Sequence, residues 1–472
     1  MNGLENIIDA ACIVTDSNGM APYLTDWRGR YQGIAQAVVK PRTIEEVAAV
    51  MRWASSTGTP VVPQGGNTGL SGGATPDRSG RAIVLSLERM NRIRAIDPVG
   101  NTLVAEAGCI LAHVQEAAVE AGRLFPVSLG SEGSCQIGGI VATNAGGINV
   151  IRYGMTRDLV LGLEYVTAAG VIVPGPRRLR KDNAGFDLRH LLVGSEGSLA
   201  ILTAAAFRIV IPPPARVSAL CGITDPTSAL SLLSHLREVG SDAITSFELM
   251  CDGEMTLIRE RLPEIAQPLS GRYPWYVFVE LGGSVQEPLE DLMSDALSQA
   301  IDSGIVQDAI LAQSVAQAQA IWHVRFAVSE ANRLAGFSVS HDVSVATADL
   351  PAFLAAISDR LPRIFSGARP LFVGHVGDGN MHVILHFRHD GPKSRLERDA
   401  LALRVNDAVY DIVGEFRGSI SAEHGIGRSG LAVFSKTANP EELRLMQGIK
   451  QVFDPAHILN PGAVVDPPRT RD

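Results

Sequence analysis

Two glycine-rich segments near the start of the chain limit its fold more than any other feature. Five glycines lie in the stretch from Gly65 to Gly73, and a second series runs from Gly130 to Gly147. Glycine leaves backbone N–H groups uncovered, and such groups in a turn can converge on a pyrophosphate without a lysine. Neither segment has P-loop or Rossmann spacing. We therefore expect an extended ligand along exposed backbone, although a flexible surface loop would explain the first segment alone almost as well.

A helix and a strand precede the first glycine segment. The capping box Thr43-Ile44-Glu45-Glu46 predicts a helix start, Gly58 can end that helix, and Pro60-Val61-Val62 is a short apolar strand. We expect further strands at 82–87, 102–105, 159–167 and 199–210, and a helix at 111–121. The sequence therefore predicts an α+β architecture.

Length and proline content divide the chain into domains. A chain of 472 residues is too long for one ordinary hydrophobic core. The run Pro212-Pro213-Pro214 can continue neither a helix nor a central strand, so it marks a boundary. We expect a first domain over 1–214, a second α/β domain over 215–417 and a tail over 418–472. The second domain should include one helix over 318–334. The tail is too short for a core of its own and should pack back on the first domain.

Composition excludes several classes of partner. A net charge of −9 without a basic block argues against nucleic acid and anionic membranes, and the short basic run Arg177–Lys181 is better explained as a solvated loop. The five cysteines are scattered without a C-x-x-C pair, which favours a reducing compartment. Neither a secretory leader nor a sufficiently long apolar run is present, so we expect a cytoplasmic protein without a membrane span.

Two histidines and a distant glutamate have the composition of a metal site. His375 and His382 flank a stretch containing Gly377 and Gly379, and a turn there is needed to bring the two imidazoles to one side. Together with Glu423 they would leave one position open on an ion such as Zn²⁺, as in catalytic sites. The alternative is that the two are ordinary loop histidines and Glu423 a solvated charge, and the histidine pair alone would favour it.

Several motifs form a specific set together with the glycine segments. They are Pro63–Gly69 with Ser71–Gly73, Gly138-Gly139 with Thr143–Gly147, Tyr153–Asp158, Lys181–Asn183 with Gly194–Leu199, and Asn460–Gly462. With them the chain, from about Lys40 to Val465, resembles the flavoproteins of the vanillyl-alcohol oxidase and p-cresol methylhydroxylase (PCMH) type, and within these the FAD-linked D-2-hydroxyacid dehydrogenases.

The resemblance implies a PCMH-type FAD-binding domain, an α/β cap domain for the substrate, and a C-terminal segment that returns to the FAD domain. Neither glycine loop carries the histidine that tethers FAD in some relatives, so the FAD should be non-covalent. The positions matched to FAD contacts are Pro63, Gly65, Gly66, Asn67, Thr68, Gly69, Ser71, Gly138, Gly139, Thr143, Asn144, Gly146, Gly147, Tyr153, Gly154, Asp158, Glu196, Gly197, Leu199, Ile201 and Asn460.

The resemblance also assigns the active site. His375, His382 and Glu423 match the ligands of a divalent metal, and His424 matches the base that takes the substrate hydroxyl proton. Arg325 matches the arginine that binds the substrate carboxylate, and Ser329, one helical turn later, can add a hydroxyl donor. Each of these last two, taken alone, would more simply be a helix-surface residue.

Two positions depart from the pattern of the relatives. Ser340 replaces a lysine that helps hold the substrate in many of them, and Ile384 replaces an asparagine of the 2-hydroxyglutarate enzymes. One cation and one amide are therefore missing from the expected pocket, which favours a smaller or more apolar hydroxy acid.

The sequence thus predicts an FAD- and metal-dependent enzyme that oxidises a D-2-hydroxy acid to the 2-oxo acid. Electrons would pass to a non-nicotinamide acceptor such as an electron-transfer flavoprotein or a quinone. Two alternatives stay open: an FAD-binding subunit of a multi-subunit glycolate or lactate oxidase, and another flavin chemistry on this scaffold, such as ether-lipid synthesis. A homodimer is compatible with the sequence.

Overall fold

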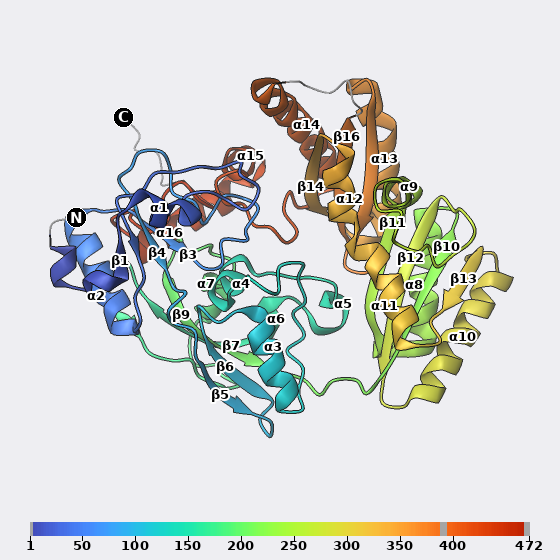
Figure 1. Ribbon diagram of the computed structural model, residues 1–472, viewed down its shortest axis with the longest axis horizontal. Helices are drawn as coiled ribbons and strands as arrows, with labels where there is room; N and C mark the ends of the chain where they lie inside the picture. The colour runs from blue at the N-terminus through green and yellow to red at the C-terminus, as the bar shows by residue number, and fades with distance from the viewer. Residues whose placement is uncertain (1–2, 388–393, 467–472) are drawn as a thin grey trace. The chain divides into compact units, whose positions relative to one another are not determined.

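The computed structural model describes residues 3–387 and 394–466, which form two compact units (Figure 1). Unit 1 comprises Met1–Gly147, Tyr153–Pro212 and Glu423–Asp472, and unit 2 comprises Ile148–Arg152 and Pro213–Ala422. The short segment Ile148–Arg152, which the sequence boundaries put in the first domain, groups with unit 2. Its Arg152 Nη1 donates to Gly282 O at 2.9 Å, which ties the segment to the sheet of that unit.

Unit 1 begins with a small sheet in which β3 and β4 run parallel. Helix α2 (Ile44–Thr57) starts at Thr43, whose side chain accepts a hydrogen bond from Glu46 N, and ends at Gly58 with φ 65°. The predicted start and end of the helix are therefore confirmed, but the capping box is only half formed, since Glu46 Oε2 accepts from Arg42 N at 2.6 Å. The strand order is β1-β2-β4-β3, with β1 Ile13–Val14, β2 Val38–Val39, β3 Val61–Gln64 and β4 Ile83–Ser86.

A second, antiparallel sheet carries the other core of unit 1. Leu103, Ile137 and Phe207 are buried in that core, where α3 (Leu111–Glu120) and α4 (Ile137–Thr143) supply apolar side chains. The strand order is β5-β6-β9-β7-β8, with β5 Ile93–Asp97, β6 Thr102–Glu106, β7 Val160–Val166, β8 Ile172–Val173 and β9 Ile201–Arg208. Short helices lie at α1 Ser17–Met20, α6 Thr156–Leu159 and α7 Arg189–Leu192, while most of α5 (Val150–Tyr153) belongs to the segment that groups with unit 2.

The C-terminal segment returns to unit 1, as expected, but from Glu423 on, since residues 418–422 of the predicted tail group with unit 2. It contains α15 (Leu431–Thr437) and α16 (Pro440–Phe453), and Leu459 then forms a parallel bridge with Val61 at the edge of the small sheet. The buried Lys450 donates from Nζ to Ser198 O at 2.7 Å and to Leu459 O at 2.8 Å. These bonds fix the tail to the first part of the chain.

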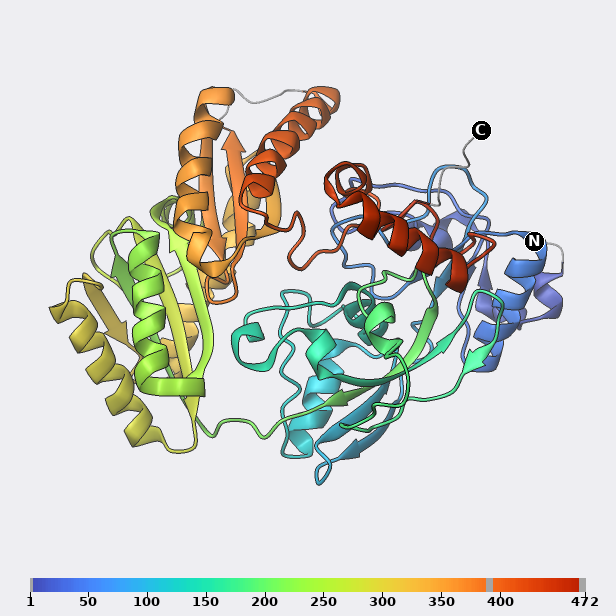
Figure 2. The ribbon, with the colours of Figure 1, turned by 180° about the vertical axis from the view of Figure 1, so that it is seen from behind.

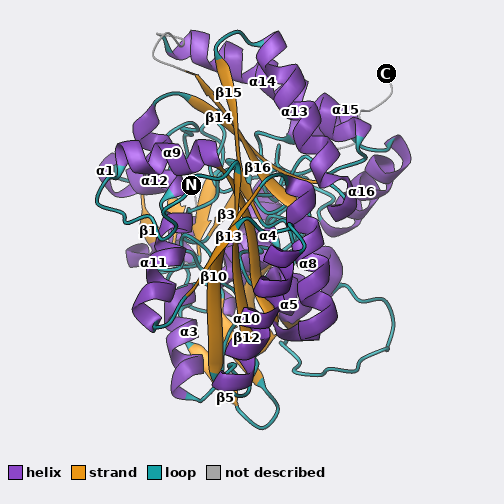
Figure 3. Cartoon of the chain, turned by 90° about the vertical axis from the view of Figure 1, so that its right-hand side faces the viewer, coloured by secondary structure: helices purple, strands orange, loops and turns teal. Residues whose placement is uncertain are grey.

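Unit 2 is a seven-stranded sheet with helices on both faces, visible from opposite sides in Figures 1 and 2. The neighbouring strands pair antiparallel in the order β13-β10-β12-β11-β15-β16-β14. The strands are β10 Ala215–Ile223, β11 Ile244–Cys251, β12 Trp275–Gly283, β13 Asp308–Leu311, β14 Ser338–Ser344, β15 Ala368–Gly374 and β16 Asn380–Phe387. Both units thus mix helices and strands, and the predicted α+β class is confirmed (Figure 3).

Two groups of helices cover the sheet of unit 2. Helices α8, α10, α13 and α14 pack against one another and against the sheet, while α9, α11 and α12 form a second group. Their bounds are α8 Pro226–Gly240, α9 Asp252–Arg261, α10 Gln286–Asp302, α11 Val315–Phe326, α12 Val328–Ala335, α13 Leu350–Ile364 and α14 Arg395–Glu415. The prediction of a single helix over 318–334 is wrong, because the helix is interrupted at Ala327 and divided into α11 and α12.

Candidate functional site

The first glycine segment leaves β3 and is held in place by two amide side chains. Gln64 Nε2 donates to Tyr23 O at 2.9 Å and to Ala74 O at 2.8 Å, which ties together the two ends of the loop. Asn67 adopts the left-handed region with φ 53°, and its Nδ2 donates to Thr25 O at 2.8 Å. The loop therefore has a defined shape rather than the freedom of a surface linker.

The two glycine segments approach each other closely in unit 1. A Cβ at Gly66 would lie 2.0 Å from Ser134 O, so only glycine fits there. A Cβ at Gly139, by contrast, would meet no atom within 4 Å, which leaves its backbone uncovered. Gln136, whose Oε1 would be 3.5 Å from a Cβ at Gly65, is buried, and this Oε1 has no hydrogen-bond partner among the described residues. Uncovered backbone N–H groups fit a pyrophosphate, and the unsatisfied amide oxygen of Gln136 could accept from a hydroxyl or amino group of a cofactor such as FAD.

The second glycine segment is shaped by left-handed residues. Asn144 has φ 51°, and its Oδ1 accepts from Arg157 N at 2.9 Å. Gly147 has φ 113°, and a Cβ there would lie 1.9 Å from Ser128 O. The hydroxyl of Thr143 donates to Gly139 O at 2.9 Å, within α4. This backbone shape requires glycine or asparagine at the positions predicted to contact FAD.

Four of the predicted FAD residues have side chains engaged within unit 1. Glu196 accepts from Ile426 N at 2.8 Å and from Gly427 N at 3.0 Å, and burial raises the pKa of its carboxyl despite these two bonds. Asn460 Nδ2 donates to Gly73 O and to Glu196 O, each at 2.8 Å. The Leu199 and Ile201 side chains lie in the hydrophobic core. Glu196 and Asn460 thus join the loops to the tail, whereas Leu199 and Ile201 pack in the core.

Ser71 connects the first glycine segment to the segment that carries His424. Its hydroxyl Oγ donates to His424 O at 3.1 Å and to Gly425 O at 3.0 Å, and its carbonyl accepts from Arg428 N at 2.9 Å. The backbone of the predicted base is thus fixed by the loop predicted to hold the cofactor.

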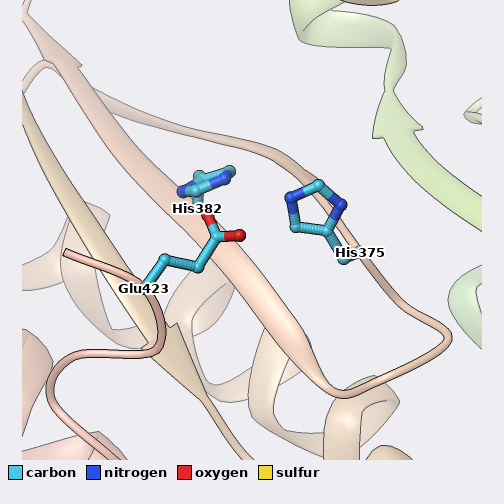
Figure 4. A group of neighbouring side chains, drawn as sticks. All are labelled: His375, His382 and Glu423. Atoms are coloured by element: carbon cyan, nitrogen blue, oxygen red, sulfur yellow. The ribbon is translucent and has the colours of Figure 1, made fainter. Parts of the chain in front are cut away.

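The glycine turn expected between His375 and His382 is present. β15 ends at Gly374 and β16 begins at Asn380, and Gly379 has φ 86° where a Cβ would lie 2.2 Å from Val345 O. This turn brings the two imidazole centroids to 5.8 Å from each other. The predicted histidines therefore face one side, as Figure 4 shows.

Glu423 completes a group of three ligands with these histidines. One atom from each of His375, His382 and Glu423 lies within 4.8 Å of the others (Figure 4). Glu423 follows Ala422, whose N donates to Asp342 O at 3.2 Å, and Asp342 pairs with His382 across β14 and β16. This arrangement fits a divalent cation with two imidazole ligands and one carboxylate.

A carboxylate lies beside each histidine, and that of Glu248 hydrogen-bonds His375. Glu248 Oε1 lies 2.5 Å from His375 Nδ1, and Asp342 Oδ1 lies 3.7 Å from His382 Nδ1. Carboxylates in this position orient metal-binding imidazoles and leave Nε2 as the ligand atom. Glu423 Oε1 also accepts from Gly147 N at 2.7 Å. The ligand set therefore has the outer support that metal centres usually have.

Arg325 and Ser329 do not lie on one helix. Arg325 lies in the last turn of α11 and pairs with Glu248, with its Nε at 2.8 Å and Nη2 at 2.7 Å from Oε2. Because the helix breaks at Ala327, Ser329 lies on α12, where it is exposed. The expectation that Ser329 follows Arg325 by one turn of the same helix is wrong. Arg325 and His375 lie near each other because both contact Glu248.

Sequence reasoning missed Glu248. It is a buried carboxylate in the strand β11, which is otherwise mostly apolar. Burial alone would raise the pKa of this carboxyl, but His375 and Arg325 lower it to about 2. The available signal was a charged residue between Phe247 and Leu249 in a mostly apolar run, since unpaired charges are rarely buried.

A second buried carboxyl, Glu254 on α9, was missed as well. Its Oε2 accepts from Asn332 Nδ2 at 2.7 Å, and burial raises its pKa to about 7. Its Oε1 and the Oδ1 of Asn332 have no other partner among the described residues. A proton on Oε1 would allow it to donate to Asn332, so a neutral acid suits this site.

The two departures from the relatives lie opposite each other. Ser340 on β14 pairs with Ile384 on β16, two pairs along from Asp342 and His382. Side chains two residues apart on a strand share a face, so both lie on the face that carries His382. Ser340 is exposed and Ile384 is buried.

Comparisons with known proteins identify the family of the chain. Residues 212–464 match the family described as FAD linked oxidases, C-terminal domain, and residues 35–174 match the FAD binding domain. The D-2-hydroxyglutarate dehydrogenase of Xanthomonas citri pv. viticola is 36% identical, over 98% of this chain and 96% of that protein. The mitochondrial D-2-hydroxyglutarate dehydrogenase of Arabidopsis thaliana is 34% identical, over 98% of this chain and 80% of that protein.

Among solved structures, p-cresol methylhydroxylase with substrate bound has the same fold, with a TM-score of 0.78 and 17% identity over 98% of this chain and 96% of that chain. The expected PCMH-type fold is therefore confirmed. The chain belongs to the FAD-linked oxidases, within the group of FAD-dependent D-2-hydroxyacid dehydrogenases.

Proposed function

We propose that this protein is an FAD- and metal-dependent dehydrogenase that converts a D-2-hydroxy acid to the 2-oxo acid. The observation that carries the proposal is the ligand group His375, His382 and Glu423, with atoms within 4.8 Å, in a chain of the FAD-linked oxidase family. Zn²⁺ suits two imidazoles and one carboxylate with an open position.

The reaction removes two hydrogens from the substrate. The hydroxyl proton goes to a base, and the hydrogen on C2 leaves with its electron pair as the C=O bond forms. Bound FAD supplies the two-electron acceptor for that hydride. A divalent ion held by the ligand group supplies a Lewis acid for the 2-hydroxyl and carboxylate oxygens.

The side chains of the protein orient the acid and accept its proton. Arg325 presents a planar guanidinium, which suits the two oxygens of the substrate carboxylate. His424 directly follows Glu423 in the chain and is the residue we assign as the base, since imidazole exchanges protons near neutral pH. Flavin loops without a tethering histidine should bind FAD non-covalently.

The substrate should be smaller or more apolar than D-2-hydroxyglutarate, although the two relatives compared above are named for that acid. Ser340 and Ile384 offer a hydroxyl and an aliphatic group beside His382, where a second carboxylate would need a donor. Burying a carboxylate without partners costs on the order of a few kcal/mol. We therefore propose that lactate-like and longer aliphatic or aromatic D-2-hydroxy acids are preferred.

The electron acceptor is expected to be an electron-transfer flavoprotein or a quinone. In the described part of the chain no helix combines the length and apolar composition needed to cross a bilayer. The cytoplasmic location stays a prediction, because the relatives compared include a bacterial and a mitochondrial protein. A requirement for a partner subunit is the competing proposal, and a homodimer is a further expectation.

Anaerobic mixing of the purified chain with a panel of D-2-hydroxy acids tests the proposal. The flavin absorbance should be bleached by D-lactate-like acids without any added protein, and kcat/KM should be lower for D-2-hydroxyglutarate and D-malate. Bleaching only after a partner subunit is added would favour the multi-subunit oxidase. A preference for the dicarboxylates would show that another residue supplies the missing charge.

A further inference from the structure

Glu248 uses its two carboxylate oxygens for two different partners. Oε1 lies 2.5 Å from His375 Nδ1, and Oε2 lies 2.8 Å from Arg325 Nε and 2.7 Å from Arg325 Nη2. Its side chain is 1% exposed, so water does not compete for these interactions. One buried carboxylate thus joins a proposed metal ligand to the proposed substrate-binding arginine.

The sheet register explains why this position reaches both partners. Leu249 pairs with Gly374, so Glu248 lies on β11 beside the point where β15 ends and His375 follows. Arg325 approaches from the last turn of α11. The carboxylate is therefore held by the centre of the sheet, whereas its two partners lie at the ends of their elements.

We infer that Glu248 is a positioning residue that couples metal binding to substrate binding, an inference that rests on the proposed function. Toward His375, it accepts a hydrogen bond from Nδ1–H and leaves Nε2 to face the metal. Toward Arg325, it holds the Nε–Nη2 edge of the guanidinium and leaves the Nη1–Nη2 edge for the substrate carboxylate. Loss of this one carboxylate should disturb both functions.

A purely structural ion pair makes a different prediction. Removing it would lower stability without changing the affinity of the folded enzyme for Zn²⁺ or its KM. Glu280 offers a matched control, since it lies on the neighbouring strand β12 and pairs with Arg216 at 3.3 Å. The Glu280 side chain is 13% exposed. None of the interactions described above joins it to His375, His382 or Glu423.

The test compares Glu248→Gln, Glu248→Asp and Glu280→Gln in the FAD-loaded full chain. Zn²⁺ affinity is measured by competition with a chromophoric chelator, and KM and kcat are measured for the best D-2-hydroxy acid. Glu248→Gln should weaken Zn²⁺ binding about 10- to 100-fold, as is typical when the carboxylate behind a metal-bound histidine is lost. It should also raise KM, while Glu280→Gln leaves both values unchanged.

The aspartate variant and a double variant make the coupling measurable even where glutamine lowers stability. Glu248→Asp keeps the charge but shortens the side chain by one methylene. It should therefore weaken the contacts with His375 and Arg325 to different extents. Arg325→Lys should raise KM with little change in Zn²⁺ affinity. Combined with Glu248→Gln, it should add less to KM than it does alone, because residues that share a partner are not additive.

The outcomes separate this inference from the proposed function. Wild-type enzyme that has no Zn²⁺ affinity would refute the metal site itself and the inference with it. Wild-type enzyme that binds Zn²⁺, with folded Glu248→Gln within twofold of wild type in Zn²⁺ affinity and KM, would overturn the inference alone.

Discussion

Replacing Glu254 by glutamine should make the stability of unit 2 less dependent on pH. Burial raises the pKa of this carboxyl from 4.5 to about 7, whereas the unfolded chain keeps the ordinary value. Below pH 4.5 both states hold the proton, and above pH 7 neither does. Between these values only the folded state is protonated, so the free energy of unfolding falls as pH rises through this window.

The size of the effect follows from the shift. A difference of about 2.5 pKa units corresponds to roughly 3 kcal/mol at full ionisation, of which about 2–3 kcal/mol is lost between pH 5 and pH 8. Glutamine has the shape of the neutral acid and an amide that can donate to Asn332 Oδ1. Glu254→Gln should therefore gain about 2–3 kcal/mol over wild type between pH 5 and pH 8.

Urea unfolding at several pH values measures this difference. Hydrogen exchange of peptides from β12, the buried centre of the sheet, reports the unfolding of unit 2 specifically. The exposed Glu264→Gln serves as the control and should show no such trend. A difference between Glu254→Gln and wild type that stays constant across this pH range would refute the reasoning.

Three further predictions concern the cofactor, the metal and the base. Gly66→Ala should abolish FAD binding, because its Cβ would lie 2.0 Å from Ser134 O, whereas Gly69→Ala meets no atom within 4 Å and should keep the yellow holoenzyme by absorbance. Chelation of the metal, or His382→Ala, should abolish turnover with the FAD still bound, and full turnover of a verified metal-free enzyme would contradict the ligand assignment. His424→Ala should slow flavin reduction on the order of 10²–10⁴-fold in stopped flow with metal content retained. If His424→Ala instead lost the metal, and regained the wild-type rate of flavin reduction once metal was restored, His424 would serve to position Glu423.

Local chemistry made parts of the fold predictable. The N-cap at Thr43 and the closing glycine at Gly58 determine where α2 begins and ends, because both act through the backbone next to them. The turn between His375 and His382 follows from glycines within the same stretch. The sequence alone did not determine that Glu423 lies beside them; that assignment came from the family resemblance.

Features that depend on distant contacts were not predictable in this way. The break at Ala327 has neither proline nor glycine, and it occurs where Val328 and Ala331 turn into the core of unit 2. Glu248 meets Arg325 and His375 only after the sheet forms, so no local pattern links the three. The segment Ile148–Arg152 joins unit 2 for a similar reason, since a Cβ at Gly377 would lie 2.4 Å from Ile151 Cδ1.

The bridge between Leu459 and Val61 also affects how the protein can fold during translation. Leu459, which bridges the edge of the small sheet, and the buried Lys450, which bonds Ser198 O, are absent until the tail has left the ribosome. At roughly 5–20 residues per second, the interval between synthesis of Pro212 and of Leu459 lasts on the order of 10–50 s. The first part of unit 1 must therefore wait with an incomplete core while most of unit 2 is made as one continuous stretch. This waiting state is the one in which chaperone binding would matter most.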